Sequence, residues 1–567
     1  MAQNIGEYSY ETSFPCYGTI TSCHFTKLMY LIITERNHPD GHQKIINHLK
    51  NKKNLRKINY KNEKGWTALM IACQNSNILS SNKTVKLLIE KGANVNLQDN
   101  ENWTALMGAS RYLNRGNIIE IIKLLIEAGA DINLKNNDGW TALMMASKYS
   151  STDSNIETVK LLIEAGANIN LQNIFGYTAL MLASRDSNID SNIETVKLLL
   201  KAGVDVNLKN NDGQTALMMA SMYSNTDSNI ETVKLLIEAG TDVNLQENNG
   251  WTALMLASIY SNEFSSIETV KLLLEAETNV NLQENNGWTA LMLASIYSNE
   301  FSSIETVKLL LEAETNVNLQ NNKGWTALMV ASRYSNEFSS IETVKLLLEA
   351  GANVNLQNNE GWTALMVASR YSNEFSSIET VKLLLDADAD VNIQNIKGKT
   401  ALMYSSKKSG NDSNLDTVNL LLDYHSNPNI KNKKGWTALT YASKYINSSS
   451  NIETLSLLLE YGADYNYIFE INLLQDQFNK CLEIINRKSF QKNIKKYIHK
   501  NIKYISQKIL FNPNSIRSQI IVLGLILENC PIENCITWNN LQLFDYLDIS
   551  DLDSLKTKIY DALKYLD

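Results

Sequence analysis

A tetrapeptide that recurs at a fixed interval is the feature that most limits how this chain can fold. Thr-Ala-Leu-Met, or Thr-Ala-Leu-Thr in the last copy, begins every 37 residues. The copies begin at Thr67, Thr104, Thr141, Thr178, Thr215, Thr252, Thr289, Thr326, Thr363, Thr400 and Thr437. A constant period of this length is typical of solenoids, in which each repeat packs only against its neighbours. We therefore expect one array of eleven repeats, although 567 residues would otherwise suggest several globular domains.

Each repeat contains two segments with the apolar spacing of a helix. In residues 324–360 they read TALMVAS and IETVKLLLEA, with a polar stretch between them. Ser339 and Glu342 have the spacing of a capping box, in which each side chain accepts a hydrogen bond from the other residue's backbone amide. Gly351 follows the second segment, where the residue after a helix often adopts a positive φ. Each repeat is thus predicted to be a pair of helices.

Four repeats have another residue at this helix-stop position, namely Glu277, Glu314, Asp388 and His425. A left-handed residue that carries a Cβ costs on the order of 1 kcal/mol relative to glycine. We therefore expect four strained helix ends in the array.

The repeat pattern G-W-T-A-L-M-x-A-S, followed by V-K-L-L-L-E-A-G-A-N-V-N, resembles the consensus of ankyrin repeats. The Asn-rich repeats are most similar to the ankyrin-repeat proteins of amoeba-infecting giant viruses. The resemblance implies an all-α ankyrin solenoid of helix-turn-helix units with short hairpin loops. It also implies a non-catalytic protein that binds other proteins in a concave groove.

This chain departs from the family consensus in three ways. Ala replaces the family's Pro at the first helical turn, Met replaces its His, and four extra residues lie between the two helices. Ala is the best helix former and Met packs adaptably, so we expect the helices to persist. The insert is expected to lengthen the rim opposite the hairpin tips.

The period divides the chain into three predicted parts. They are an N-terminal capping segment with a degenerate half repeat (1–64), eleven ankyrin-like repeats (65–471) and a small helical C-terminal region (472–567). The half repeat is inferred because Ile58 and Asn59 precede Val95 and Asn96 by one period, and because residues 44–49 have a helical pattern.

Composition and charge exclude several classes of function. The chain is 44% hydrophobic and 20% charged, as in folded proteins, and its net charge of -8 provides no general attraction for nucleic acid or an anionic membrane. Six cysteines are too few and too scattered for a disulfide framework. The first twenty residues have neither the basic start nor the apolar core of a signal peptide, so we expect none. We expect a monomeric protein of the cytoplasm, the host cytoplasm if it is viral, without nucleic-acid or membrane partners.

Histidines and cysteines offer two hypotheses for a metal site. His38, His42 and His48 form a cluster that would need a further ligand, which Cys16, Cys23 or His24 could supply. We favour ordinary histidines of the capping segment.

Cys530 and Cys535 lack a second pair at zinc-ribbon spacing, so we interpret them as structural thiols. No phosphate-binding loop and no triad of nucleophile, base and orienting group has a recognisable spacing. We therefore predict no enzyme activity, metal, cofactor or small-molecule substrate.

The resemblance places a binding groove at the residue after the repeat's glycine and at the two residues after Ala-Ser. Trp, Tyr and Arg are enriched at binding hot spots, and these positions are largely aromatic or cationic. In three central repeats, apolar residues replace the cation found in most others, which predicts a partner that is apolar in the middle and acidic at its ends. The candidate binding residues are Met222, Trp251, Ile259, Tyr260, Trp288, Ile296, Tyr297, Arg333 and Arg370.

A structural interpretation of these aromatic residues has equal weight. A residue present in nearly every repeat often stacks on its neighbours, and Phe264, Phe301, Phe338 and Phe375 in the inserts offer partners. Residues 250–286 and 287–323 differ at only two of 37 positions, so duplication can also explain the repeated groove.

Two functions follow from the sequence. The first is a scaffold that holds one or more proteins, including host proteins if the chain is viral. The second is a substrate adaptor for a ubiquitin ligase, because residues 541–563 distantly resemble an F-box, although they lack its usual Leu-Pro opening.

Overall fold

The computed structural model describes most of the repeat array and little of the C-terminal region. The described residues are 10–16, 19–75, 79–111, 118–151, 153–188, 192–226, 228–446, 448–468, 473, 476–477 and 479–485. The chain forms two compact parts, Met1–Asn353 and Val354–Asp567, which are considered separately below.

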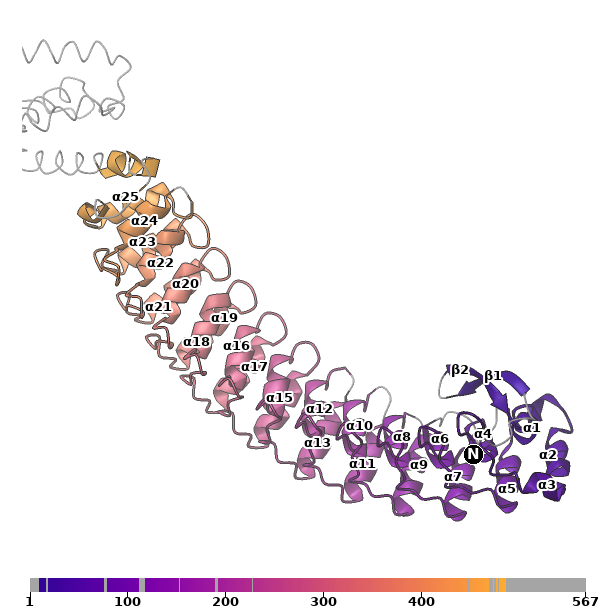
Figure 1. Cartoon of the computed structure of the whole chain (residues 1–567). Helices are drawn as coiled ribbons and strands as arrows, with labels where there is room; N and C mark the ends of the chain where they lie inside the picture. Colours follow the sequence, from indigo (N-terminus) through magenta and orange to yellow (C-terminus); the bar gives the residue numbers. More distant parts are fainter. Residues whose placement is uncertain are drawn as a thin grey trace, which may run out of the picture. The chain divides into compact units, whose positions relative to one another are not determined.

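Every repeat folds into a pair of helices, which confirms the predicted solenoid of helix pairs (Figure 1). The first helices are α4 (Ala68–Gln74), α6 (Ala105–Arg111), α8 (Ala142–Lys148), α10 (Ala179–Arg185), α12 (Ala216–Met222), α14 (Ala253–Ile259), α16 (Ala290–Ile296), α18 (Ala327–Tyr334), α20 (Ala364–Arg370), α22 (Ala401–Lys408) and α24 (Ala438–Tyr445). The second helices are α5 (Asn82–Glu90), α7 (Ile118–Glu127), α9 (Asp153–Glu164), α11 (Ile193–Lys201), α13 (Ile230–Glu238), α15 (Ile267–Glu275), α17 (Ile304–Glu312), α19 (Ile341–Glu349), α21 (Ile378–Asp386), α23 (Leu415–Asp423) and α25 (Ile452–Glu460).

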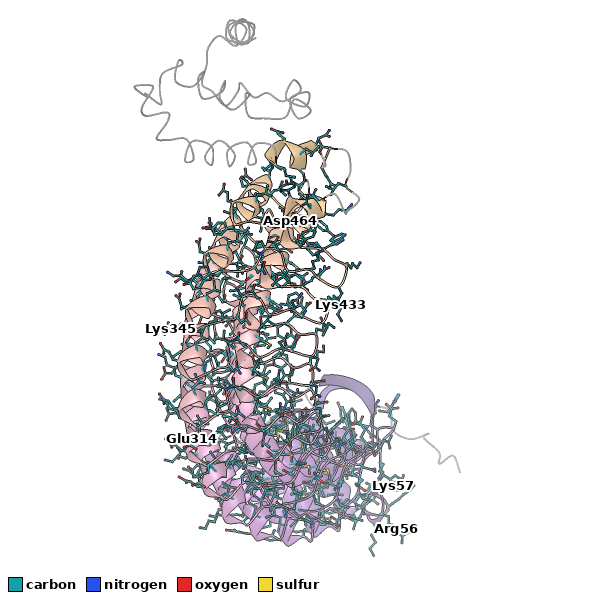
Figure 2. The ribbon with its side chains drawn as sticks, turned by 90° about the vertical axis from the view of Figure 1, so that its left-hand side faces the viewer. Arg56, Lys57, Glu314, Lys345, Lys433 and Asp464 are labelled. Atoms are coloured by element: carbon teal, nitrogen blue, oxygen red, sulfur yellow. The ribbon has the colours of Figure 1, made fainter. Side chains whose placement is uncertain are left out.

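Within each part the helices form two rows. First helices contact one another in sequence from α4 to α18 in the first part and from α20 to α24 in the second. Second helices form a parallel series of contacts, and each also packs on the first helix of its own repeat. Figure 2 shows the two rows, with Lys345 on the row of second helices and Lys433 in a hairpin loop.

The Thr-Ala-Leu-Met motif begins the first helix and fills the core. The Thr252 side chain caps α14 by accepting a hydrogen bond from the Met255 amide at 3.2 Å. Ala253, Leu254 and Met255 are buried because the helix has neighbours on both sides in its row and a second helix behind it. The motif therefore encodes both the helix start and its burial.

The second helix begins one residue later than the predicted capping box. The N-cap of α19 is Ser340, whose hydroxyl accepts from the Thr343 amide at 3.1 Å, and Glu342 is exposed in the first turn. Ser339 is buried, 3.4 Å from the Ser298 hydroxyl of the preceding repeat. The Ser339–Glu342 capping box was therefore wrong, because contact with the previous repeat occupies the first serine of the pair.

The four predicted left-handed helix stops are confirmed. Glu277, Glu314, Asp388 and His425 have φ values of 57°, 55°, 61° and 65°. The glycine at the same position in another repeat, Gly351, has a φ of 80°, and a Cβ built there meets no atom within 4 Å. The cost at the four sites is therefore conformational rather than a steric clash.

Hairpin loops join successive repeats and lie close to one another. Gly287 has a φ of 83°, and a Cβ added there would lie 2.7 Å from the Asn322 backbone nitrogen. Asn102 takes the corresponding place in an earlier loop with a φ of 62°. Positive φ and close approach of the next loop together favour glycine at this position.

Amide side chains link each hairpin loop to the next. The Asn244 Oδ1 accepts a hydrogen bond from the Asn279 amide at 2.7 Å, one repeat further on. Gln246 Nε2 donates to the Gly250 carbonyl in its own loop at 2.7 Å and to the Gln283 carbonyl at 2.9 Å. These bonds recur along each part, so the many Asn and Gln residues satisfy loop backbone groups that no regular ladder satisfies.

The insert between the helices forms a second ladder, made of hydroxyl groups. The Ser224 Oγ accepts from Thr269 Oγ1 at 2.6 Å and from the Ser266 amide at 3.2 Å, both in the next repeat. The Asn225 amide donates to the Phe264 carbonyl at 3.0 Å. The additional residues therefore connect neighbouring repeats as well as lengthening the rim.

The N-terminal segment contains two strands that the sequence analysis did not predict. β1 (Tyr10–Cys16) and β2 (Thr19–Phe25) form an antiparallel hairpin in which Tyr10 pairs with Phe25. They precede α1 (Lys27–Ile33), the 3-10 helix η1 (Glu35–Asn37), α2 (Gly41–Lys50) and α3 (Lys52–Leu55). α1 packs on α4, and α2 packs on α5, so this pair extends both rows of helices.

Glu35 joins this segment to the first repeat. Its buried carboxylate accepts hydrogen bonds from the Ser81 amide at 3.0 Å, the Ser81 hydroxyl at 2.6 Å and the Thr84 hydroxyl at 2.8 Å. Ser81 and Thr84 are the counterparts of Ser266 and Thr269, so Glu35 takes the part that Ser224 has further along the array.

The array ends in the second part with the 3-10 helix η2 (Tyr465–Ile468), which packs on α24. Gln477 donates to the Lys444 carbonyl at 2.8 Å, and Cys481 is buried. The rest of the predicted helical C-terminal region, with Cys530, Cys535 and the F-box-like segment 541–563, lies outside the described residues.

Replacing the strained helix stops by glycine is expected to stabilise the protein. Glu277→Gly and Glu314→Gly should each raise the free energy of unfolding by about 1 kcal/mol, because glycine adopts a positive φ without penalty. Thermal denaturation of the full chain measures the effect as a higher Tm. Glu275→Gly, two residues earlier within α15, is the matched control and should lower the Tm. An unchanged or lower Tm in the first two variants would contradict the assignment of strain.

Two serines of one repeat should differ sharply in their contribution to stability. Ser224→Ala removes the acceptor of the Thr269 hydroxyl and the Ser266 amide, so we expect a loss of about 1–3 kcal/mol in chemical denaturation. Ser221→Ala is the control, because the buried Ser221 hydroxyl has no hydrogen-bond partner among the described residues. That variant should be neutral or slightly more stable, and equal losses in both would refute the ladder.

Candidate partner-binding face

Eight of the nine predicted binding residues lie in the first part, and Arg370 lies in the second. Met222, Ile259 and Ile296 are the last residues of α12, α14 and α16, which are consecutive neighbours in the row of first helices. Equivalent positions in a stacked array share one face, and we call this face, at the carboxyl ends of the first helices, the candidate face.

Most side chains of this face are only partly accessible. Ile259 is buried, with 9% of its surface exposed, while Met222 and Ile296 are half-buried. Trp251 and Trp288 precede α14 and α16 and are also half-buried. The face therefore presents edges of large side chains rather than a deep cavity.

The tyrosines after these helices pack on the phenylalanines of the inserts. The Tyr260 and Phe264 ring centroids are 5.6 Å apart, and Tyr297 lies 5.6 Å from Phe301. Tyr297 also lies 6.4 Å from Phe338 of the next repeat. Aromatic pairs at these distances stabilise a fold, so the stacking role exists in this structure whether or not the face binds a partner.

Cations of the first part lie over aromatic rings. The Arg333 guanidinium carbon is 5.8 Å from the Trp325 ring centroid and 5.0 Å from that of Tyr334. Arg111 and Lys148 make the same kind of contact, at 5.6 Å from Trp103 and 5.8 Å from Trp140.

Arg185 has a different environment from the other cations. Asp186 takes the place that tyrosine holds in most repeats, and its carboxylate accepts from the Arg185 Nε at 2.7 Å. This hydrogen bond raises the pKa of Arg185 further. The charge of Arg185 is thus already neutralised within its own repeat.

The second part carries the densest group of cations on aromatic rings. Arg370 lies 5.6 Å from the Trp362 ring and 4.9 Å from that of Tyr371. Lys399 Nζ lies between two tyrosine rings, 5.1 Å from Tyr404 and 4.7 Å from Tyr441.

The sequence analysis did not predict that Lys399, Tyr404 and Tyr441 form a group. Lys399 stands at the position that is Trp in eight repeats, while Tyr404 and Tyr441 replace the Val, Leu, Met, Ile or Gly found there in the other repeats. Both tyrosine rings are buried, and each hydroxyl accepts from an asparagine amide at 2.8 Å. Adjacent repeats that depart together from the residues of the other repeats were the signal in the sequence that could have revealed this group.

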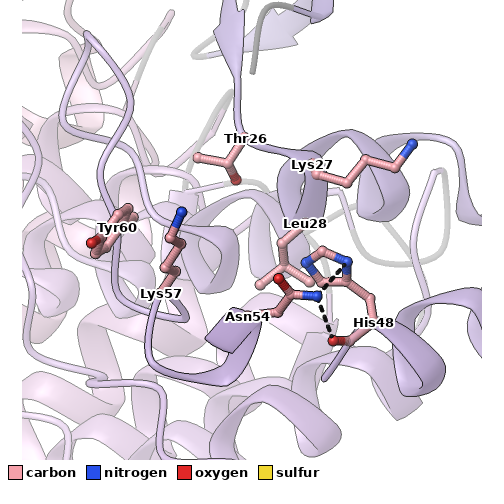
Figure 3. Close-up of a pocket in the computed structure, with 7 residues that line it drawn as sticks. All are labelled: Thr26, Lys27, Leu28, His48, Asn54, Lys57 and Tyr60. Atoms are coloured by element: carbon pink, nitrogen blue, oxygen red, sulfur yellow. Dashed lines mark hydrogen bonds between the residues drawn. The ribbon is translucent and has the colours of Figure 1, made fainter. Parts of the chain in front are cut away.

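The N-terminal segment contains a small pocket that opens to solvent (Figure 3). It is lined by Thr26, Lys27, Leu28, His48, Asn54, Lys57 and Tyr60. Asn54 Nδ2 donates to the His48 carbonyl at 3.1 Å, and burial together with the charge of Lys27 lowers the pKa of His48. This pocket holds no arrangement of nucleophile and base.

The predicted histidine cluster is dispersed in the structure. His42 Nδ1 lies 2.8 Å from Thr84 Oγ1 and 3.3 Å from Glu35, whereas His48 contacts Asn54 in the pocket. His24 pairs with Glu63 at 3.3 Å. Among the described residues, no three of His, Cys, Asp or Glu gather as metal ligands.

The described thiols are poorly suited to act as nucleophiles. Cys73 is completely enclosed in α4, and burial raises its pKa strongly. Burial also raises the pKa of Cys481. Nucleophilic cysteines need an accessible thiolate, which neither residue provides. Within the same described residues, no helix has the length and apolar character needed to span a membrane.

Comparison with known proteins relates the chain to proteins of a giant virus. Segments are similar to the ankyrin repeat proteins L88, L289 and L91 of Acanthamoeba polyphaga mimivirus, with identities of 55%, 58% and 53%. Each match covers 16% of this chain and 10%, 17% and 15% of the respective relatives. The similarity thus concerns the repeats, and only a small share of each relative's length.

The family described as ankyrin repeats (3 copies) matches the chain in overlapping segments that extend from residue 35 to residue 468. The matched segments are 35–136, 79–173, 113–210, 152–244, 188–284, 222–318, 297–395 and 374–468. They cover most of the chain and coincide with the helix pairs described above. The chain therefore belongs to the ankyrin-repeat family.

Proposed function

We propose that this protein is a non-catalytic scaffold that binds partner proteins on the candidate face of its first helices. Ankyrin repeats imply protein partners. The Trp and Tyr edges on this face are large, rigid and held by packing, which reduces the entropy lost on binding. This arrangement is suited to recognition and supplies no reacting group.

One variable position among nearly identical repeats carries the proposal. The seventh residue of the first helix is Met222, Ile259 and Ile296 in three consecutive repeats, and Arg333 in the next. Repeats 287–323 and 324–360 differ at only five of 37 positions, one of which is Ile296 against Arg333, so variation at this position changes the face without changing the fold. It creates an apolar centre beside a cation, as expected for a partner with a matching pattern.

The relatives suggest where partners are to be found. The relatives are proteins of Acanthamoeba polyphaga mimivirus, a virus named after an amoeba. We infer that the partners include host proteins, which the scaffold meets in the host cytoplasm.

Converting the apolar centre to a cationic one should abolish partner capture. Arginine occupies this position in other repeats, so Ile259→Arg combined with Ile296→Arg should preserve the fold. In affinity capture from Acanthamoeba lysate with the full chain, we expect at least about a tenfold loss of the proteins that the parent retains, because a charge must be desolvated without a partner. Ile259→Glu with Ile296→Glu should give the same loss.

The control variant carries Glu275→Gln and Glu312→Gln, which raise the net charge by the same amount as the double arginine variant. Both control residues are exposed on second helices of the same two repeats. Retained capture in the control together with loss in the arginine variant supports the face. Full capture in the arginine variant would refute it.

A further inference from the structure

Three cationic side chains of the second part share one face, and no carboxylate among the described residues neutralises their charges. Arg370 and Lys407 occupy equivalent positions in the adjacent helices α20 and α22, and Lys399 immediately precedes the cap of α22. All three side chains are half-buried. None forms an ion pair with a carboxylate among the described residues, although Lys408 beside them pairs with Asp412 at 2.7 Å.

Tyrosine rings fix the positions of these charges. Lys399 Nζ lies between the Tyr404 and Tyr441 rings, and Lys407 Nζ lies 4.4 Å from the Tyr445 ring centroid. The Arg370 guanidinium lies 5.8 Å from the Tyr404 ring. A cation held over a ring keeps its charge while losing conformational freedom, so it is prepared for an anion.

The Arg370 Nε is a hydrogen-bond donor that is available to a ligand. This atom is buried and has no acceptor in the part of the chain that the structure describes. A guanidinium uses its planar set of donors best with a carboxylate. An anionic group at this face would therefore satisfy both charge and hydrogen bonding.

We infer that Arg370, Lys399 and Lys407 form a docking site for an acidic peptide segment of a partner protein, whose Asp or Glu carboxylates lie between the three cations. This inference deepens the proposed function, and it rests on that function only in taking the ligand to be part of a protein. The coincident departures at Lys399, Tyr404 and Tyr441 from the residues of the other repeats distinguish this site from the rest of the array.

The electrostatic environment of Lys399 agrees with this geometry. Burial, followed by the charges of Lys407, Lys397, Arg370 and Lys434, lowers the pKa of Lys399 to about 8. Glu360 is close enough to influence Tyr404, but it forms no ion pair with the three cations. A carboxylate brought to this face would relieve repulsion that the free protein retains.

The test uses the full chain and a fluorescein-labelled peptide of alternating Glu and Ala residues, with binding measured by fluorescence anisotropy. Lys399→Trp introduces the residue that eight other repeats carry, and Arg370→Ile the residue at Ile259 and Ile296, so both should fold. We expect each to weaken binding by about tenfold. Lys382→Ile removes an equal charge from the exposed surface of α21 and should leave the affinity unchanged.

The affinity of the parent protein should also fall as the pH rises from 7 to 9. Lys399 is mainly protonated below its pKa of about 8 and mainly neutral above it, and only the protonated form attracts a carboxylate. In the Lys399→Trp variant the affinity should no longer depend on pH in this range. If Lys399 had only a structural role, the affinity of the parent would not show this dependence on pH.

Several results would overturn the inference. They are failure of the peptide to bind the parent, equal loss in the Lys382→Ile control, or displacement of the peptide by a single-stranded oligonucleotide that binds more tightly through the same residues. A peptide with Gln in place of Glu should not bind. Peptide binding is measured without the Ile259 and Ile296 variants, so a failure of the peptide to bind does not refute the proposed scaffold function. Equally, unchanged protein capture by the Ile259 and Ile296 variants does not refute the acidic-peptide site.

Discussion

The fold depends on hydrogen bonds that each repeat can complete only with its neighbour. Loop backbone amides and carbonyls have no regular strand partner. Across one period, Asn side chains of the hairpin loops and Ser hydroxyls of the inserts accept from the amides, and Gln side chains donate to the carbonyls. An unsatisfied buried polar group costs more than the bond contributes, and Ser224 and Thr269 of the insert ladder are buried, so the hydroxyl ladder is obligatory. The two ladders together link each repeat to the next. They account for the Asn-rich character of the repeats and for the four additional residues between the helices.

This requirement also limits where the sequence can vary. A ladder needs equal spacing, so the 37-residue period is constant through the array, and the hairpin position is glycine in every repeat except the one that carries Asn102. The candidate face lies outside the ladders, at the ends of the first helices, and its last helical position changes freely between cation and apolar residue. Function can therefore diverge on this face while neighbouring repeats remain nearly identical.

Local patterns predicted the helix pairs and the four left-handed stops, because both depend on residues within one repeat. The capping box at Ser339 was displaced by one residue, since a Ser-Ser pair offers two equivalent caps and the contact with Ser298 selects between them. Glu35 was not predicted either, because it substitutes for a serine of a repeat that has lost its consensus.

The sequence by itself determined the period, the two helices of each repeat, the family and the positions that vary on the candidate face. Only the tertiary structure decided which polar groups pair between repeats and that Lys399 lies between the Tyr404 and Tyr441 rings. The reason is physical: helix propensity and capping act over a few residues, whereas ladder bonds and cation–ring contacts join residues a whole repeat apart.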